Sequence, residues 1–348
     1  MLQTKIVLIV TVFLGAYIPI ASAWDHPGHM TTAAIAFAEI ERERPEVIDA
    51  LGMLFLAHPD PAPFWVAANE AKGKERARRM FIECARWPDD SKFTPRDIGA
   101  WHTARWAIVA EDAPEEVIAG AEARQGNPAG QALEALQLHA AMIANPETSP
   151  SERALALCWV MHITGDIHQP MHVSDLFTAE FPTGNAAASL SYVDDPIGST
   201  TIPLHILWDS NVMRSPALAE VDKHATQFVK KHPRSNFPEL EANPVDEPGA
   251  FEAWAREAHQ VAIDWAYDIE TTADPVENQS SDELIAKMVN FVLNGVSPVE
   301  EAPEVSAEYW EKLQLTAELR VTLAGYRIAD IIIAAADNIE AQRKFVAH

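Results

Sequence analysis

The amino-acid sequence predicts an all-α protein, a single mainly helical domain with one long irregular excursion. Alanine is abundant, only 14 of the 348 residues are glycine, and strongly alternating strand patterns are few. Apolar residues recur at helical spacing over most of the chain, which is the pattern of helices that bury one face. This combination favours packed helices over a sandwich or a barrel.

Ten segments carry the helical spacing and are expected to be helices. They are 30–42, 45–57, 63–85, 113–123, 129–144, 150–166, 215–230, 249–271, 282–295 and 305–342. The sixth has a clear start signal, because Ser149 and Pro150 precede its apolar face and suit the cap and the first turn of a helix.

Two connections interrupt the helices. The stretch 176–204 is rich in Pro, Gly and Asn and is the long irregular excursion, within which "ASLSYV" (188–193) is expected to form a short hairpin strand. A second connection lies at 232–248. We expect one domain over residues 24–348, and a separate C-terminal module from about residue 245 is the alternative.

The first 23 residues resemble a secretory signal. Lys5 precedes an apolar run from Ile6 to Ile20, and Ala21-Ser22-Ala23 fits a small-x-small cleavage site. The apolar run is shorter than the ~20 residues of a membrane span. We therefore expect a mature chain that begins at Trp24 and is secreted or periplasmic, with an uncleaved N-terminal anchor as the alternative.

The charge balance excludes one class of nucleic-acid binder. The chain has 26 basic and 51 acidic residues, a formal net charge of −25, and removal of Lys5 with the signal makes it −26. Such a surface repels polyanions, so a phosphate substrate has to be drawn in by a local positive charge such as bound metal ions. The two cysteines, Cys84 and Cys158, exclude a disulfide-rich scaffold and are either paired or two buried thiols.

The segment "HITGDIHQPMH" (162–172) concentrates residues that can bind metal. His162 and Asp166 stand four apart on one helical face, and His172 follows the turn at Pro170. The pair His205 and Asp209 repeats the spacing of four. One such pair alone indicates a helical ion pair, but two pairs with a flanking histidine favour a zinc site.

Two further residues, Asp89 and His102, are candidate metal ligands only when they are considered together with these histidines and aspartates. Asp89 lies just past a predicted helix, where an aspartate is ordinarily a turn or cap residue. His102 stands between Trp101 and Trp106, where a histidine is ordinarily part of the core.

With these residues the sequence resembles the secreted trinuclear-zinc single-strand nucleases of the S-one/P-one type, to which zinc-dependent phospholipase C is structurally related. The matching motifs follow the family order over residues 24–209, and beyond Asn211 only helical character matches. The positions are Trp24 with His29, Trp87-Pro88-Asp89, Trp101-His102, then His162, Asp166 and His172, and finally Leu204 to Asp209.

The resemblance implies three zinc ions and assigns their ligands. One ion takes Asp89, His102, His162 and Asp166, and a second takes His172, His205 and Asp209. The third takes the amino group and carbonyl of Trp24 together with His29, and shares Asp166. An amine at Trp24 exists only after signal removal, so export and metal binding are expected to be coupled.

The resemblance also implies the chemistry, a phosphodiester hydrolysis by a zinc-activated water. Asp89 is expected to orient that water, and Lys92 to stabilise the developing negative charge. Asn211 is a weaker candidate for the same role as Lys92, and His168 is expected to pack or to hydrogen-bond rather than to bind metal.

The implied substrates are single-stranded DNA and RNA, handled by a monomer without stable membrane association. Where the family places a base-stacking aromatic and an acid after His102, this chain has Thr103 and Arg105, so weak base selection is expected. The alternatives are a phospholipase C-like hydrolase and a non-catalytic zinc-binding helical protein.

Overall fold

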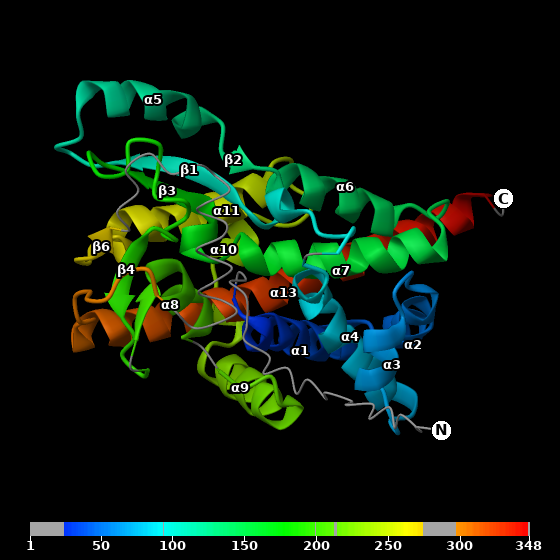
Figure 1. The fold of residues 1–348 in the computed structure, drawn as a ribbon. Coiled ribbons are helices and arrows are strands. Elements are labelled where there is room, and N and C mark those ends of the chain that lie inside the picture. Colours follow the sequence, from blue (N-terminus) through cyan, green and yellow to red (C-terminus); the bar gives the residue numbers. More distant parts are fainter. Residues whose placement is uncertain (1–23, 93, 199, 212–213, 274–296, 347–348) are drawn as a thin grey trace, which may run out of the picture.

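The structure is a computed structural model, and it describes residues 24–92, 94–198, 200–211, 214–273 and 297–346. The expected signal (1–23) and the expected helix at 282–295 lie outside these residues. The prediction of a mainly helical fold is confirmed (Figure 1). The helices of more than one turn are α1 (His26–Glu43), α2 (Glu46–Leu54), α3 (Ala62–Ala67), α4 (Gly73–Asp90), α5 (Glu115–Gly126), α6 (Ala132–Ala144), α7 (Pro150–Asp166), α8 (Leu204–Ser210), α9 (Leu218–Lys231), α10 (Glu239–Ala242), α11 (Ala250–Val261) and α13 (Ala307–Val346).

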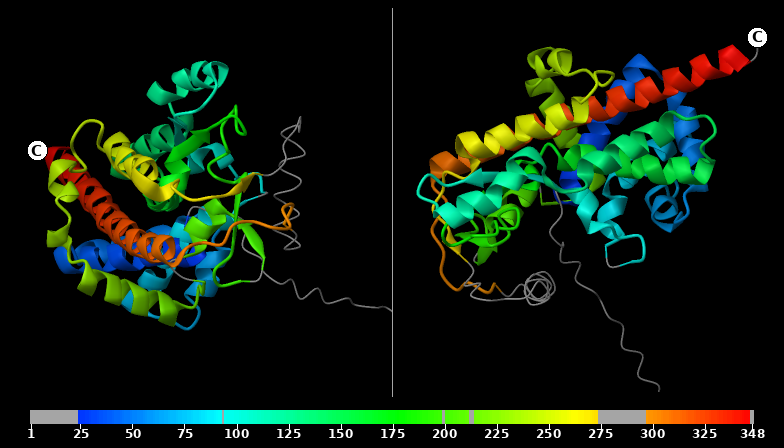
Figure 2. Two further views of the ribbon diagram at one scale, coloured as in Figure 1. Left: turned by 90° about the vertical axis from the view of Figure 1, so that its left-hand side faces the viewer. Right: turned by 90° about the horizontal axis from the view of Figure 1, so that it is seen from above.

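Helix α1 lies at the centre of the helical layer, where it contacts α13, α4 and α9 (Figures 1 and 2). The contact with α13 is close, because a Cβ atom on Gly325 would stand 2.7 Å from Cβ of Ile35. Only glycine fits there, since any side chain would push the two helices apart. The core around them is apolar and contains the fully buried Trp24, Trp87 and Trp159.

Helices α4 and α7 are joined covalently as well as by packing. Cys84 of α4 and Cys158 of α7 form a disulfide with a Cα–Cα distance of 4.7 Å. Of the two states that the sequence leaves open, the structure shows the paired one. Ser149 caps α7 as expected, because its hydroxyl accepts a hydrogen bond from the Glu152 amide in a capping box.

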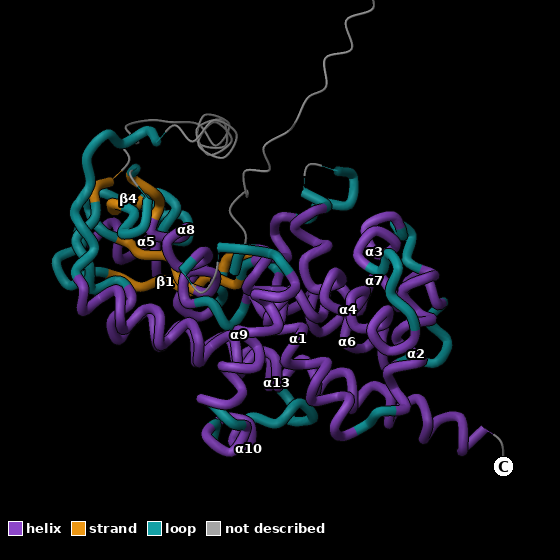
Figure 3. The backbone as a smooth tube through the Cα atoms, turned by 90° about the horizontal axis from the view of Figure 1, so that it is seen from below, coloured by secondary structure: helices purple, strands orange, loops and turns teal. Residues whose placement is uncertain are grey.

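Two small sheets gather at one end of the molecule (Figure 3). In the first, β1 (Ala104–Val109) lies between β2 (Ala129–Gly130) and β3 (Ser174–Phe177), antiparallel to β2 and parallel to β3 with Trp106 opposite Ser174. In the second, β4 (Ser191–Asp194) lies between β5 (Thr201–Pro203) and β6 (Thr272–Ala273), and both pairings are antiparallel. The β4–β5 hairpin is the strand expected from "ASLSYV", whereas β1 and β3 were not predicted.

Several predicted boundaries are wrong. The expected helix 63–85 is two helices, since the chain turns between α3 and α4 through Glu70, which has a φ of 61°. Helix α4 then continues to Asp90 with Pro88 inside its last turn, so Asp89 lies in a helix rather than past it. The expected helix 249–271 becomes α11 followed by a π-helical turn at Ala262–Ala266.

Short turns lie between these elements, and two of them contain the predicted site residues His102 and His172. These 3-10 turns are η1 (Phe55–Ala57), η2 (Gly99–His102), η3 (Pro170–Val173) and η4 (Arg234–Asn236). No helix among the described residues is long and apolar enough to cross a membrane.

Candidate metal centre

The ends of several helices bring the predicted ligand residues to one place. His29 lies in the first turns of α1, Asp89 in the last turn of α4, and His162 and Asp166 in the last turns of α7. His102 and His172 lie in η2 and η3, and His205 and Asp209 lie in α8. All of these side chains are buried.

Asp166 is the centre of a first cluster. Its Oδ1 lies 3.3 Å from Nε2 of His29, and its Oδ2 lies 3.2 Å from Nδ1 of His102 and 3.5 Å from Nε2 of His162. Asp89 closes the cluster, with Oδ1 at 3.5 Å from Nε2 of His162 and 4.0 Å from Nδ1 of His102. Two overlapping sets within this cluster could each hold a metal ion.

His172, His205 and Asp209 form a second cluster that could hold an ion. Nε2 of His205 lies 3.1 Å from Nε2 of His172 and 3.2 Å from Oδ2 of Asp209. Oδ1 of Asp209 lies 3.8 Å from Nε2 of His172. This set has three protein ligands, the number that leaves a coordination position open on zinc.

The outer nitrogens of these imidazoles determine which inner nitrogen carries a lone pair. Nδ1 of His172 lies 2.7 Å from the His102 carbonyl oxygen, and Nδ1 of His205 lies 2.7 Å from the Ala187 carbonyl oxygen. A carbonyl oxygen only accepts, so each Nδ1 carries the proton, and the Nε2 of a neutral imidazole is then unprotonated. Two lone pairs facing each other at 3.1 Å repel unless a cation lies between them.

In the first cluster a carbonyl oxygen fixes the tautomer of one imidazole, that of His162. Nδ1 of His162 lies 2.8 Å from the Ala85 carbonyl oxygen, which leaves Nε2 of His162 as the acceptor that faces Nδ1 of His102 at 3.0 Å. Burial lowers the pKa of His162 and of His205 to about 4, so both are neutral near pH 7. Neutral imidazole is the form that binds transition metals.

Several carboxylate oxygens of the two clusters lack a hydrogen-bond donor from the described residues. Both oxygens of Asp166 and Oδ2 of Asp209 are buried without a hydrogen-bond partner, and so is Nε2 of His29. Burial raises the pKa of Asp166 and of Asp209 well above the ordinary value. Buried acceptors without donors are costly, and bound cations would satisfy all of them at once.

Trp24 reaches the centre through its main chain and its indole. The indole Nε1 donates to the Gly165 carbonyl oxygen at 3.0 Å, and the amide of Asp25 donates to the Asp209 carbonyl oxygen at 3.0 Å. The main chain at Trp24 therefore lies between α7 and α8. His29, which the resemblance groups with Trp24, also stacks on His162 with 3.8 Å between ring centroids.

Lys92 points back into the first cluster. Its Nζ lies 2.7 Å from Oδ1 of Asp89. Its charge acts on the pKa of residues in both clusters, including His102, Asp166 and Asp209. Asn211 is also buried close by: its Nδ2 donates to the Trp208 carbonyl oxygen, and its Oδ1 finds no hydrogen-bond partner among the described residues.

His168 and Gln169, which follow Asp166 in the chain, are buried and make hydrogen bonds beside the candidate metal centre. Both ring nitrogens of His168 are engaged, Nδ1 at 2.7 Å from the Thr164 carbonyl oxygen and Nε2 at 2.8 Å from a guanidinium nitrogen of Arg327. This agrees with its expected hydrogen-bonding role. Gln169, which the sequence reasoning missed, donates from Nε2 to Oδ1 of Asp209 at 2.7 Å. Its place between two histidines of the 162–172 segment was the available signal.

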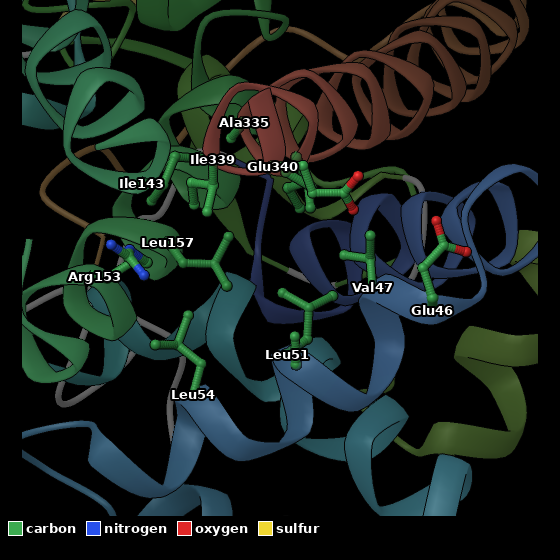
Figure 4. A pocket seen from close by; sticks show the side chains of 13 residues that line it. Glu46, Val47, Leu51, Leu54, Ile143, Arg153, Leu157, Ala335, Ile339 and Glu340 are labelled. Carbon is green, nitrogen blue, oxygen red and sulfur yellow. The ribbon is translucent and has the colours of Figure 1, made fainter. Parts of the chain in front are cut away.

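An apolar cavity lies elsewhere in the molecule. It has a volume of about 250 Å³ and lies between α2, α7 and α13, lined by side chains such as Leu51, Leu54, Leu157 and Ile339 (Figure 4). Glu46, Arg153 and Glu340 also line it, but none of the predicted site residues does, and its lining includes no histidine or aspartate. The histidine and aspartate clusters are therefore the candidate site.

Comparisons with known proteins agree with this geometry. The family model described as S1/P1 Nuclease matches residues 24–337. Nuclease S1 of Aspergillus oryzae is 25% identical over 252 residues, which are 70% of this chain and 75% of that protein. Endonuclease 2 of Arabidopsis thaliana is 30% identical over 131 residues, 36% of this chain and 42% of that protein. Because the family match spans nearly the whole described chain and the clustered histidines and aspartates could hold metal, the protein belongs to the S1/P1 nuclease family and is a phosphodiester-cleaving enzyme.

Proposed function

We propose that the protein is a zinc-dependent nuclease that hydrolyses single-stranded DNA and RNA. The observation that carries the proposal is the pair of Nε2 lone pairs of His172 and His205, which face each other at 3.1 Å beside Asp209. The nuclease class follows from the family match. The metal, its number and the strand preference are the proposed parts.

Three zinc ions would use the ligands that the resemblance assigns. The first would be held by Asp89, His102, His162 and Asp166, and the second by His172, His205 and Asp209. The third would be held by the amino group and carbonyl of Trp24, by His29 and by Asp166. Neutral imidazoles together with carboxylates are a donor set that suits zinc, whereas Mg²⁺ and Ca²⁺ prefer all-oxygen sites.

The main-chain carbonyls of Ala85, His102 and Ala187 support this assignment. Each accepts from the outer nitrogen of a proposed ligand, and such contacts hold metal-binding imidazoles in the right tautomer and direction. Bound zinc would supply positive charge in an acidic protein and lower the pKa of a bound water to about 7.

Asp89 and Lys92 are the proposed catalytic residues. Asp89 would orient the attacking water through its carboxylate, and the ammonium of Lys92 would stabilise the negative charge that develops on the phosphate oxygens. The distance of 2.7 Å between Nζ of Lys92 and Oδ1 of Asp89 places the two groups together.

Weak base selection is the proposed specificity. Arg105 stands at the position where the family has an acid that contacts the edge of a base. In this chain the arginine lies 3.8 Å from a carboxylate oxygen of Asp175 instead. Trp106 is a buried core residue covered by the guanidinium of Arg256 at 4.4 Å from its ring centroid, so it offers no stacking face. Phe93, the aromatic residue that follows Lys92 in the chain and could also stack on a base, lies outside the described residues.

The structure does not favour the phospholipase alternative. That reading needs apolar side chains exposed on the excursion 176–204. Phe177, Phe181, Leu190 and Tyr192 of this excursion are all buried, and Ile197 is the one large apolar side chain that the described part of it exposes. A single exposed side chain offers little apolar surface to a lipid.

We further propose that residues 1–23 are removed on export and that the mature protein works as a secreted or periplasmic monomer. Removal frees the amino group of Trp24, which is the proposed ligand of the third ion. N-terminal sequencing of exported protein tests the cleavage site, and light scattering tests the monomer.

The deciding experiment uses protein that begins at Trp24 and is loaded with zinc. It is assayed on single-stranded and double-stranded DNA, RNA, nucleoside 3′-monophosphates and phosphatidylcholine, before and after chelation. We expect single strands to be cut with weak base preference, activity to disappear on chelation, and zinc to restore it. Rapid hydrolysis of phosphatidylcholine without nucleotide release would establish the phospholipase reading. Bound zinc without any turnover would establish the non-catalytic one.

A further inference from the structure

Three successive alanines adopt a backbone conformation that side chains disfavour. Ala186, Ala187 and Ala188 have φ angles of 53°, 60° and 64°. This left-handed region is disfavoured by every residue with a Cβ atom, and non-glycine residues visit it singly rather than in runs. Such a run persists only where the surrounding structure holds it in place.

Asp175 and Asn185 hold the turn. Oδ1 of Asp175 accepts from the Ala187 amide at 3.2 Å, and Oδ1 of Asn185 accepts from the Ala188 amide at 3.1 Å. Both holding residues are buried, with Asp175 1% exposed. Gly184 completes the arrangement, because a Cβ atom there would stand 2.8 Å from the Asp175 carboxylate.

Two arginines face the other side of the Asp175 carboxylate. Nη1 of Arg124 lies 3.0 Å from Oδ2 of Asp175, and Nη1 of Arg105 lies 3.8 Å from the same oxygen. Oδ1 therefore remains available to the Ala187 amide. A buried, charged and hydrogen-bonded carboxylate is a rigid anchor for the main chain that it contacts.

The turn presents two carbonyl oxygens to His205. The Ala187 carbonyl oxygen lies 2.7 Å from Nδ1 of His205, and the Ala188 carbonyl oxygen accepts from the His205 amide at 3.3 Å. The first contact sets the tautomer of the imidazole and directs Nε2 towards His172 and Asp209. The second fixes the main chain of the same residue.

We propose that Asp175 is a positioning residue of the candidate metal centre: by holding the left-handed turn at 186–188, its carboxylate fixes the tautomer and direction of His205. The Asp175–Ala187–His205 contacts form a continuous path from a buried ion pair to a proposed zinc ligand. The inference rests on the proposed function for its metal consequences, whereas the tautomer is a property of the metal-free protein.

The first test measures that tautomer directly. Metal-free wild-type protein, labelled with ¹⁵N in its histidines, is expected to show the His205 imidazole with its proton on Nδ1. The signal is assigned by its absence in His205→Gln. In Asp175→Ala we expect both tautomers of His205, because the Ala187 carbonyl is no longer held against Nδ1. An unchanged single tautomer in Asp175→Ala would overturn the proposal.

The second test measures zinc binding. Loss of a contact behind a metal ligand weakens affinity by about 10–100-fold, so Asp175→Ala is expected to bind one ion that much more weakly and to keep the other ions. Asp175→Asn retains an oxygen that can accept from the Ala187 amide and should lie between Ala and wild type. Adding Ala187→Gly to Asp175→Ala should restore part of the affinity, because glycine adopts positive φ freely.

Asp195→Ala is the matched control. Asp195 also pairs with an arginine, Arg214, and accepts from a loop amide, that of Ile197, but its loop holds no histidine. We expect wild-type tautomer and zinc affinity in this variant, with similar circular dichroism for all variants. Equal effects of Asp195→Ala and Asp175→Ala, or equal weakening of every ion in Asp175→Ala, would overturn the proposal. If the wild type binds no zinc, the proposed function fails, and the tautomer measurement still decides this inference.

Discussion

The ammonium of Lys92 lies 2.7 Å from the carboxylate of Asp89, three residues earlier in the chain. Burial alone raises the pKa of Asp89, but Lys92 and the neighbouring histidines outweigh burial and hold this pKa well below the ordinary value. Asp89 is therefore ionised near pH 7, so it can act as both a metal ligand and a hydrogen-bond acceptor for water.

Asp89→Asn is expected to abolish turnover, whereas Asp90→Asn is expected to change it little. Asp89 faces the clustered histidines, but both oxygens of Asp90 accept from Arg86 at 2.8 Å outside the cluster. Steady-state rates on single-stranded DNA, with circular dichroism to verify folding, check the comparison. Equal losses in the two variants would show that the assigned register of the motif is wrong.

Lys92→Met is expected to lower kcat by about 10²–10³-fold, the usual effect of removing one group that stabilises developing charge. Zinc content should stay at the wild-type value, because an ammonium is not a metal ligand. Lys92→Arg should keep part of the rate, and Lys74→Met is the control, since Lys74 pairs with Glu41 at the surface. An unchanged kcat in Lys92→Met would remove Lys92 from the reaction.

Protein that begins at Trp24 is expected to bind one more zinc ion than protein with a single glycine added before Trp24. The amide nitrogen of the extended chain cannot replace the free amine as a ligand. The indole of Trp24, which donates to the Gly165 carbonyl oxygen, should keep its buried position in both proteins. Elemental analysis of the two proteins checks this, and full zinc content with the extension would refute the amine assignment.

Protonation of His162 and His205 is expected to destabilise the metal-free protein as the pH falls from about 6.5 to about 4. Asp166 and Asp209 act in the opposite direction, because their raised pKa values make the folded state bind more protons on acidification. Burial lowers the pKa of His162 and of His205 to about 4. An unfolded histidine titrates near 6.5, so between these values the unfolded state binds more protons, and lowering the pH favours it. Each histidine accounts for roughly 3 kcal/mol over that range. Thermal melts of chelated protein at a series of pH values measure this. The same melts of a His162→Gln/His205→Gln variant isolate the histidine contribution: its melting temperature should fall less, or rise more, on acidification than that of wild type. An identical pH dependence of the two proteins would contradict the prediction.

Local patterns in the sequence determined much of this protein. Helical spacing of apolar residues predicted the segments that became α1, α6, α7, α9 and α13, because helix hydrogen bonds join residues four apart and the pattern is complete within a short window. The spacing of four residues predicted that each of two His–Asp pairs lies on one face of a helix. His162 and Asp166 lie on α7, and His205 and Asp209 lie on α8.

The strands could not be predicted in the same way. Ala104–Val109 pairs with Ser174–Phe177, about seventy residues later in the chain, and neither segment alternates strongly. A parallel pairing depends on partners distant in sequence. The break between α3 and α4 was missed for another reason, since the apolar spacing runs through it while the backbone turns at Glu70.

The candidate site residues could thus be predicted from the sequence, because residue type and order carry the donor chemistry. Only the tertiary structure decided how they act together. It brought the carbonyl oxygens of Ala85, His102 and Ala187 to the outer nitrogens of three imidazoles. It also brought the Gln169 amide to the Asp209 carboxylate, and the Asp175 carboxylate to the main chain of the left-handed turn. These contacts join residues far apart in the chain or use main-chain groups that every residue possesses. No residue type marks them in the sequence, and packing alone brings them together.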